Sequence, residues 1–148
     1  MSKFLSMGQA SRKVDNLLLQ MHTTRVIIIR SPREIEHLKK SNIIVAEVFG
    51  ELQKVIEPGI TTKELDQITE KIILSKGSIP AFKGYRGFPA SLCVSINEEV
   101  VHGIPGQRRL KGGDIVSLDV GANLNGYFGD GAITLPVGEV DQAGQRLL

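Results

Sequence analysis

The sequence predicts an α/β (α+β) fold, an antiparallel sheet with two amphipathic helices packed on one face. Residues 32–76 place apolar side chains at helical spacing in two stretches, each preceded by a Ser/Thr-x-x-Glu motif. From Gly77 onward glycine, proline and β-forming residues dominate. Two long strand-like runs there flank Asn125-Gly126, the strongest short-range hairpin signal. The helices therefore have a sheet to pack on.

Composition and charge limit the classes of function that this chain can have. The chain has 148 residues, 41% apolar and 23% charged, which fits one globular domain or a fragment of a larger one. A net charge of +2 is too small to indicate nucleic acid or an anionic membrane as a partner, and no apolar run approaches the length of a membrane span. The single cysteine, Cys93, excludes an internal disulfide and favours a reducing, cytoplasmic compartment.

We expect two regions. Residues 1–25 form an N-terminal arm with three interpretations: a transit peptide, a disordered arm, or a start placed too early, with Met21 as the alternative. Residues 26–148 form the domain. The helix expected after Asp141 reaches the last residue without a stop signal, the pattern expected of a domain truncated at its C-terminus.

In the first half, residues 26–29 ("VIII") predict a short strand. A capping box at 31–34 begins the first helix, which "EPG" at 57–59 ends. A second capping box at 61–64 begins a helix that continues to Gly77.

In the second half, residues 92–96 and 100–104 predict short strands joined by "NEE". Long strands are expected over 114–124 and 127–135, and Asp141 caps about two turns of helix.

The hairpin turn determines where Asp119 and Asp130 lie. With Asn125-Gly126 as a two-residue turn, Gly121 faces Asp130 and Asp119 faces Ala132. Opposed residues share a face, as do residues two apart on a strand, so the two aspartates are diagonal neighbours roughly 7–8 Å apart on one face. A three-residue loop would place them on opposite faces.

Two interpretations of this pair stay open on the residues alone. The aspartates are solvated acids on the open face of a hairpin, or they hold a cation that relieves their repulsion. No basic residue lies between Asp114 and Arg146 to neutralise them. Two ligands do not complete a metal site, so more must come from elsewhere.

Two further residues are candidates. His102, beside a Gly-Pro turn, is a structural hydrogen-bonding residue or a catalytic one. Cys93, on an expected buried strand, is interpreted as a core residue, and no histidine and carboxylate are placed to activate it as a nucleophile.

Taken together, "CVSINEEVVHGIP" and "GDIVSLDV" followed by "GYFGD", with "SPREIEHLKKSNIIVAEVFGEL" and "EPGITTKELDQI" upstream, resemble the type I methionine aminopeptidases. These enzymes have the pita-bread aminopeptidase/creatinase fold. The resemblance covers about residues 26–148 and implies the N-terminal half of that fold, with a curved antiparallel sheet.

The resemblance implies roles for individual residues. Asp119 and Asp130 match two ligands of a site for two divalent metal ions, which could be Co, Mn, Fe or Zn. His102 matches the histidine that contacts the scissile peptide and the bound water. Three further positions match the lining of the methionine pocket: Tyr85, Phe88 and Cys93.

The implied reaction is hydrolytic removal of the initiator methionine from nascent polypeptides, at the ribosome, by an enzyme that is a monomer at full length. The chain departs from the family's sequence pattern in three ways that bear on this implied reaction. Arg86 stands where the family often has a second histidine, and Gly131 follows Asp130 where a small hydroxyl residue or alanine is more usual. The family's remaining ligands, one histidine and two glutamates, have no counterpart in this chain, so we expect the isolated chain to be inactive.

Two alternatives stay open: a non-enzymatic half-domain that binds or complements another chain, and a prolidase-like enzyme that cleaves Xaa-Pro bonds. The context of Cys93 and His102 argues against the prolidase alternative.

Overall fold

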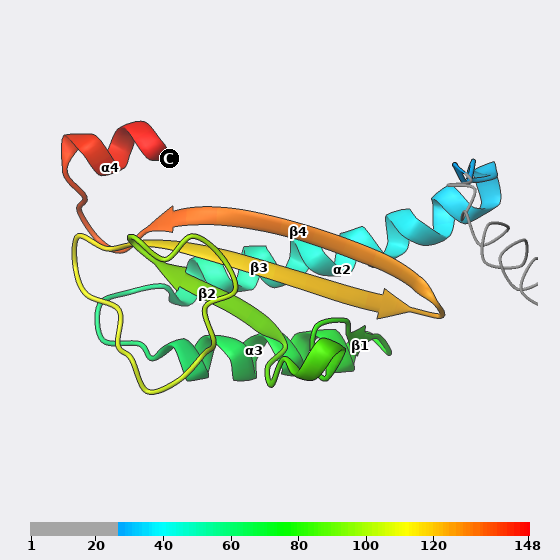
Figure 1. Cartoon of the computed structure of the whole chain (residues 1–148), viewed down its shortest axis with the longest axis horizontal. Helices are drawn as coiled ribbons and strands as arrows, with labels where there is room; N and C mark the ends of the chain where they lie inside the picture. The colour runs from blue at the N-terminus through cyan, green and yellow to red at the C-terminus, as the bar shows by residue number, and fades with distance from the viewer. Residues whose placement is uncertain (1–26) are drawn as a thin grey trace, which may run out of the picture.

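The computed structural model describes residues 27–148, so the predicted arm at 1–25 lies outside the described residues. Two long helices are followed by a four-stranded antiparallel sheet and a short C-terminal helix (Figure 1). In chain order the elements are α2 (Pro32–Val55), α3 (Thr62–Ser75), β1 (Ile79–Pro80), the 3₁₀ turn η1 (Tyr85–Gly87), β2 (Leu92–Ile96), β3 (Ile115–Leu124), β4 (Tyr127–Pro136) and α4 (Gln142–Leu147).

Both predicted capping boxes are confirmed. Ser31 Oγ accepts from the backbone N–H of Glu34, whose carboxylate accepts from the Ser31 N–H at 2.8 Å. Thr61 and Glu64 repeat the arrangement at the start of α3. Each pair satisfies backbone donors that a helix start leaves without partners.

No helix within residues 27–148 has the length and apolar content needed to cross a membrane.

Strand β3 is the centre of the sheet. β4 pairs along all of β3 through the predicted two-residue turn, in which Asn125 (φ 54°) and Gly126 (φ 85°) have the positive φ values of a type I′ turn. β2 and β1 pair with β3 in succession, over 116–120 and then 122–123. Because β4 already occupies one edge of β3, β1 and β2 share the other edge.

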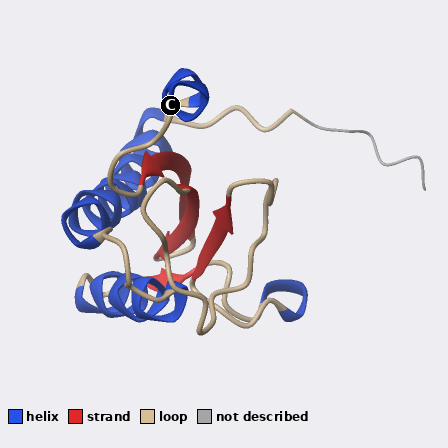
Figure 2. Cartoon of the chain, turned by 90° about the vertical axis from the view of Figure 1, so that its left-hand side faces the viewer, coloured by secondary structure: helices blue, strands red, loops and turns tan. Residues whose placement is uncertain are grey.

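Alternation along β3 separates a core face from a site face. Val116, Leu118 and Val120 are fully buried, and their face is the one that both long helices cover. Figure 2 shows α2 and α3 on the same side of the strands, with loops on the other side. The prediction of two helices on one sheet face is therefore confirmed. The helices supply most of the opposing core: Ile44, Val45, Val48, Leu52, Leu65 and Ile73.

Helix α2 lies unusually close to β4 at Gly129. A Cβ on Gly129 would lie 2.5 Å from the carbonyl carbon of Ser41, so only glycine allows this approach. The close approach lets Ser41 Oγ donate to the Tyr127 carbonyl at 2.8 Å, and it lets Asn42 Oδ1 accept from the Asp130 N–H at 3.4 Å. The helix thus holds the backbone of β4 at Asp130.

Two predicted strands are wrong. Residues 27–29 of the predicted 26–29 strand are exposed and have no regular structure, because no strand of the described part of the chain pairs with them. Residues 100–104 form a loop, because His102 (φ 61°) has a left-handed backbone that a strand cannot contain. The short strand β1 was not predicted.

Candidate active site

The two aspartates lie on the face of the sheet opposite the helices. Asp119 pairs with Ala132 and Gly121 pairs with Asp130, which is the register predicted from the two-residue turn. Asp119 is half-buried and Asp130 is exposed. The prediction that both share one face is therefore confirmed.

The charges of this pair are only partly compensated. Burial raises the pKa of Asp119, the neighbouring Asp130 carboxylate raises it further, and His102 lowers it. An acid with a raised pKa has lost solvation without gaining enough positive charge. A cation between the two carboxylates would relieve the repulsion.

Cys93 lies directly opposite Asp119 on β2 and is 4% exposed. Burial raises the pKa of its thiol to about 11, with smaller contributions from the charges of Asp119 and Asp130. The thiol is therefore neutral near pH 7, and neutral thiols are poor nucleophiles. Cys93 presents a soft apolar surface beside the carboxylates.

The loop that carries His102 is held against β2. The Val94 N–H donates to the Gly103 carbonyl at 2.9 Å, and the Gly103 N–H donates to Ser95 Oγ at 3.1 Å. A Cβ on Gly103 would lie 2.0 Å from the Val94 carbonyl oxygen, so the contact requires glycine. These contacts and the positive φ of His102 determine where the imidazole lies.

The same loop is anchored a second time at the start of α3. Thr62 Oγ1 donates to the Gly106 carbonyl at 3.0 Å and accepts from the Gly106 N–H at 2.8 Å. Glu99 adds an ion pair of 2.7 Å with Arg108. The loop is thus restrained on both sides of His102.

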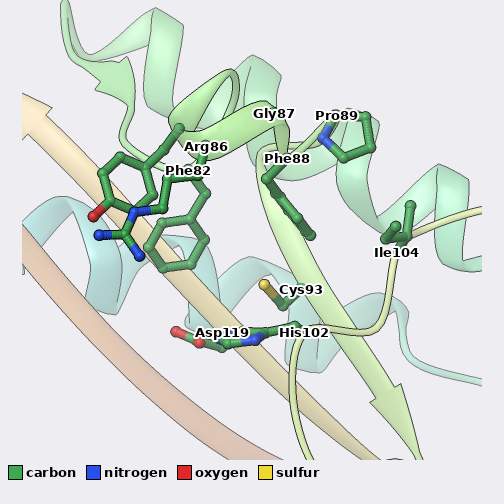
Figure 3. Close-up of a pocket in the computed structure, with 10 residues that line it drawn as sticks. Phe82, Arg86, Gly87, Phe88, Pro89, Cys93, His102, Ile104 and Asp119 are labelled. Atoms are coloured by element: carbon green, nitrogen blue, oxygen red, sulfur yellow. The ribbon is translucent and has the colours of Figure 1, made fainter.

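A pocket of about 500 Å³ opens between this loop, η1 and the sheet (Figure 3). Asp119 and His102 lie together at one side of it, with the Cys93 sulfur beside them. Five of the six predicted site residues line the pocket: Tyr85, Phe88, Cys93, His102 and Asp119. Asp130 does not line it and lies on the adjacent strand of the same face.

Sequence reasoning missed several lining residues. Phe82 packs over Gly121, where a Cβ would lie 2.7 Å from Phe82 Cε1, so glycine makes room for the ring. Pro89 and Ile104 also line the pocket. Phe82 and Pro89 lie in ordinary turn and loop sequence, and Ile104 lies in a predicted strand, so only the tertiary fold reveals all three as lining residues.

Arg86 is the remaining lining residue of note, and its backbone is strained. Its φ of 48° is left-handed, a conformation that costs a non-glycine residue about 1–2 kcal/mol. Gly84 and Gly87 on either side also have positive φ, at 86° and 83°. This turn places the Arg86 guanidinium 5.5 Å from the centre of the Tyr85 ring.

Comparison with known proteins identifies the family. The sequence model of metallopeptidase family M24 matches residues 36–148. The chain belongs to metallopeptidase family M24. The M24 match covers α2 from Glu36 onward, all of α3 and the whole sheet, including every predicted site residue.

Similar proteins agree with the M24 assignment. Methionine aminopeptidase 1 of Bacillus subtilis is 56% identical over 123 residues, 83% of this chain and 50% of that protein. The methionine aminopeptidase structure from Rickettsia prowazekii matches with a TM-score of 0.81 and 36% identity, over 82% of this chain and 49% of that one. The methionine aminopeptidase structure from Thermotoga maritima matches with a TM-score of 0.80 and 46% identity, over 82% of this chain and 49% of that one. The chain spans about half the length of these relatives.

The chemistry of the aspartate pair fits part of a metal site. Two same-face carboxylates with uncompensated charge fit a divalent cation, since carboxylate oxygens are preferred ligands of such ions. Among residues 27–148, no group of three or more His, Cys, Asp or Glu side chains is placed to hold a metal ion. A metal site here would therefore need ligands in addition to Asp119 and Asp130.

Proposed function

We propose that this chain forms the N-terminal half of a methionine aminopeptidase, which hydrolyses the bond after the initiator methionine of new polypeptides. The observation that carries the proposal is the Asp119–Asp130 pair, on the sheet face that also bears a pocket lined by aromatic side chains and a thiol. The similarity to methionine aminopeptidases supports the same reaction.

Asp119 and Asp130 would hold two divalent metal ions together with further ligands, and we expect Co, Mn, Fe or Zn. When bound, such ions polarise a carbonyl and lower the pKa of water. The protein's own contribution is the rigid hairpin, which keeps both carboxylates on one face, and the α2 contacts, which hold the backbone at Asp130.

His102 would donate a hydrogen bond to the peptide at the bond to be cleaved. Its position supports this role, because it lines the pocket beside Asp119 on a loop that is restrained on both sides. Phe88, Tyr85 and Cys93 would bind the methionine side chain, since aromatic rings and sulfur make favourable contacts with a thioether.

The partner of this site would be the N-terminal methionine of nascent polypeptides, at the ribosome and in the cytoplasm. We infer no direct contact with nucleic acid, in line with the net charge of +2. We expect the full-length enzyme to be a monomer.

A chimeric enzyme tests the proposal. Residues 1–148 would be joined to the remaining half of the Bacillus subtilis relative, and methionine release from a Met-Ala-Ser peptide would be measured with added Co²⁺ or Mn²⁺. We expect activity from the chimera and none from the 148-residue chain alone. Asp119→Asn in the chimera should abolish release, whereas Glu36→Gln, an exposed change on α2, should leave it unchanged.

Other outcomes would favour the alternatives. A folded chimera that binds metal but releases no methionine would contradict the proposal and favour a binding or complementing half-domain. Cleavage of a Gly-Pro peptide in preference to Met-Ala-Ser would favour a prolidase-like enzyme.

A further inference from the structure

Arg86 stands out among the residues that line the pocket. Of the ten lining residues, Arg86 and His102 are the two with basic side chains, and His102 lies beside Asp119. Figure 3 shows Arg86 in the upper part of the pocket, on the opposite side from Ile104. The pocket therefore contains a permanently charged cation.

The position of this cation is restrained. The Gly84 N–H donates to the Phe88 carbonyl at 2.8 Å, and the Phe88 N–H donates to the Tyr85 carbonyl at 2.9 Å, so the turn closes on itself. The Tyr85 ring supports the guanidinium at 5.5 Å. Strained, self-bonded turns of this kind are frequent at ligand-binding sites.

Apart from its contact with the Tyr85 ring, the Arg86 charge has no described partner within residues 27–148. Within residues 27–148 Arg86 forms no ion pair, whereas Lys83 pairs with Glu70 at 2.6 Å and Arg108 with Glu99 at 2.7 Å. The positive charge that lowers the pKa of Asp119 is that of His102. Arg86 therefore remains available to a ligand.

We propose that Arg86 is a specificity-determining residue that binds a carboxylate on the peptide segment following the N-terminal residue. The inference rests on the proposed function, in which the first side chain lies against Phe88, Tyr85 and Cys93. Because Arg86 lies over the Tyr85 ring, its guanidinium would then face the peptide segment that follows. A guanidinium pairs with a carboxylate through two parallel N–H donors, a geometry that an amide cannot match. The substrates favoured are peptides with an acidic residue near the N-terminus.

The test uses the 148-residue chain labelled with ¹⁵N and two amidated tripeptides, Met-Ala-Asp-NH₂ and Met-Ala-Asn-NH₂. Titrations monitored by NMR would follow the Arg86 Nε–Hε signal and the backbone amides of residues 82–88. We expect the Asp peptide to bind about three- to fivefold more tightly, and the difference to shrink at high salt. Arg86→Gln should remove the difference, whereas Arg33→Gln, an exposed change on α2, should preserve it.

Further peptides separate the outcomes. Met-Ala-Ala with a free C-terminus shows whether a main-chain carboxylate serves as well as an aspartate side chain. Equal affinity for the Asp and Asn peptides, or no binding of either, would overturn the proposal. Gly-Ala-Asp-NH₂ tests the proposed function separately: if it binds as tightly as Met-Ala-Asp-NH₂ while the Arg86 effect persists, the methionine pocket is contradicted and the Arg86 subsite is not.

Discussion

Ser95 Oγ accepts a hydrogen bond of 3.1 Å from the backbone N–H of Gly103, and this contact joins strand β2 to the loop that carries His102. Ser95 is 3% exposed, so water does not readily replace the bond. The position of the His102 imidazole therefore depends on a buried serine seven residues earlier in the chain.

Ser95→Ala should lower the free energy of unfolding by about 1–2 kcal/mol, because it leaves the Gly103 N–H without its acceptor. Chemical denaturation measures the loss, and amide exchange at Gly103 should accelerate. The matched control is Ser91→Ala: Ser91 is equally buried, but its hydroxyl has no hydrogen-bond partner within residues 27–148. Equal losses in the two variants would contradict this account.

Gly103→Ala should destabilise the chain by about 1–3 kcal/mol, because the new methyl group would meet the Val94 carbonyl oxygen and displace the loop. Gly106→Ala, three residues along the same loop, is the comparison, since a Cβ at Gly106 has nothing within 4 Å. Thermal unfolding of both variants measures the difference. A well-tolerated Gly103→Ala would show that the loop is not held as described.

Manganese should bind weakly at the aspartate pair of the isolated chain. Because Mn²⁺ is paramagnetic, the amide signals nearest Asp119 and Asp130 should broaden first during a titration. The double variant Asp119→Asn, Asp130→Asn should lose the selective broadening, since both carboxylates are then amides. Glu36→Gln removes one acid elsewhere and should leave the pattern unchanged. Broadening that persists in the double variant would place the ion at another site.

The second capping box predicts a pH dependence of stability. Hydrogen bonds from Thr61 hold the pKa of Glu64 below its ordinary value of 4.5. Because the pKa of Glu64 is lower in the folded state, its contribution to stability is fully present above pH 4.5. That contribution is lost as the pH falls through the folded-state pKa of Glu64. Glu64→Gln should therefore show a smaller loss of stability on acidification below about pH 4.5, as measured by denaturation at successive pH values.

Glu57→Gln is the control for this effect, because within residues 27–148 the Glu57 carboxylate forms no hydrogen bond or ion pair. It should retain the wild-type acid response. An identical response in Glu64→Gln would show that the capping carboxylate does not contribute.

The hairpin and the capping boxes could be predicted because their signals are local. Asn125-Gly126 selects a two-residue turn, and turn length alone decides that Asp119 and Asp130 share a face. Ser31 and Thr61 each lie three residues before their glutamate partners. In each case the interacting groups are close in the chain, or their register follows from one turn.

The errors and omissions depend on tertiary contacts. Residues 100–104 contain β-forming side chains, yet the Gly103 contact with Val94 holds them in a loop. Phe82 lines the pocket because Gly121, on a strand far along the chain, leaves space for its ring. Periodicity and propensity carry no information on either contact. The pocket positions Tyr85 and Phe88 could be anticipated only through the family resemblance.

The glycine at position 129 has a consequence for how this domain can vary. Any larger side chain there would push α2 away from β4, and the Asn42 hydrogen bond to the Asp130 backbone would be lost with it. Such a substitution would look like an interior packing defect, on the opposite face of the sheet from the acids. Under the proposed function, its first effect would nevertheless be weaker affinity for a metal ion at Asp130, so a survey of inactive variants should not assume that damage begins at the residues lining the pocket.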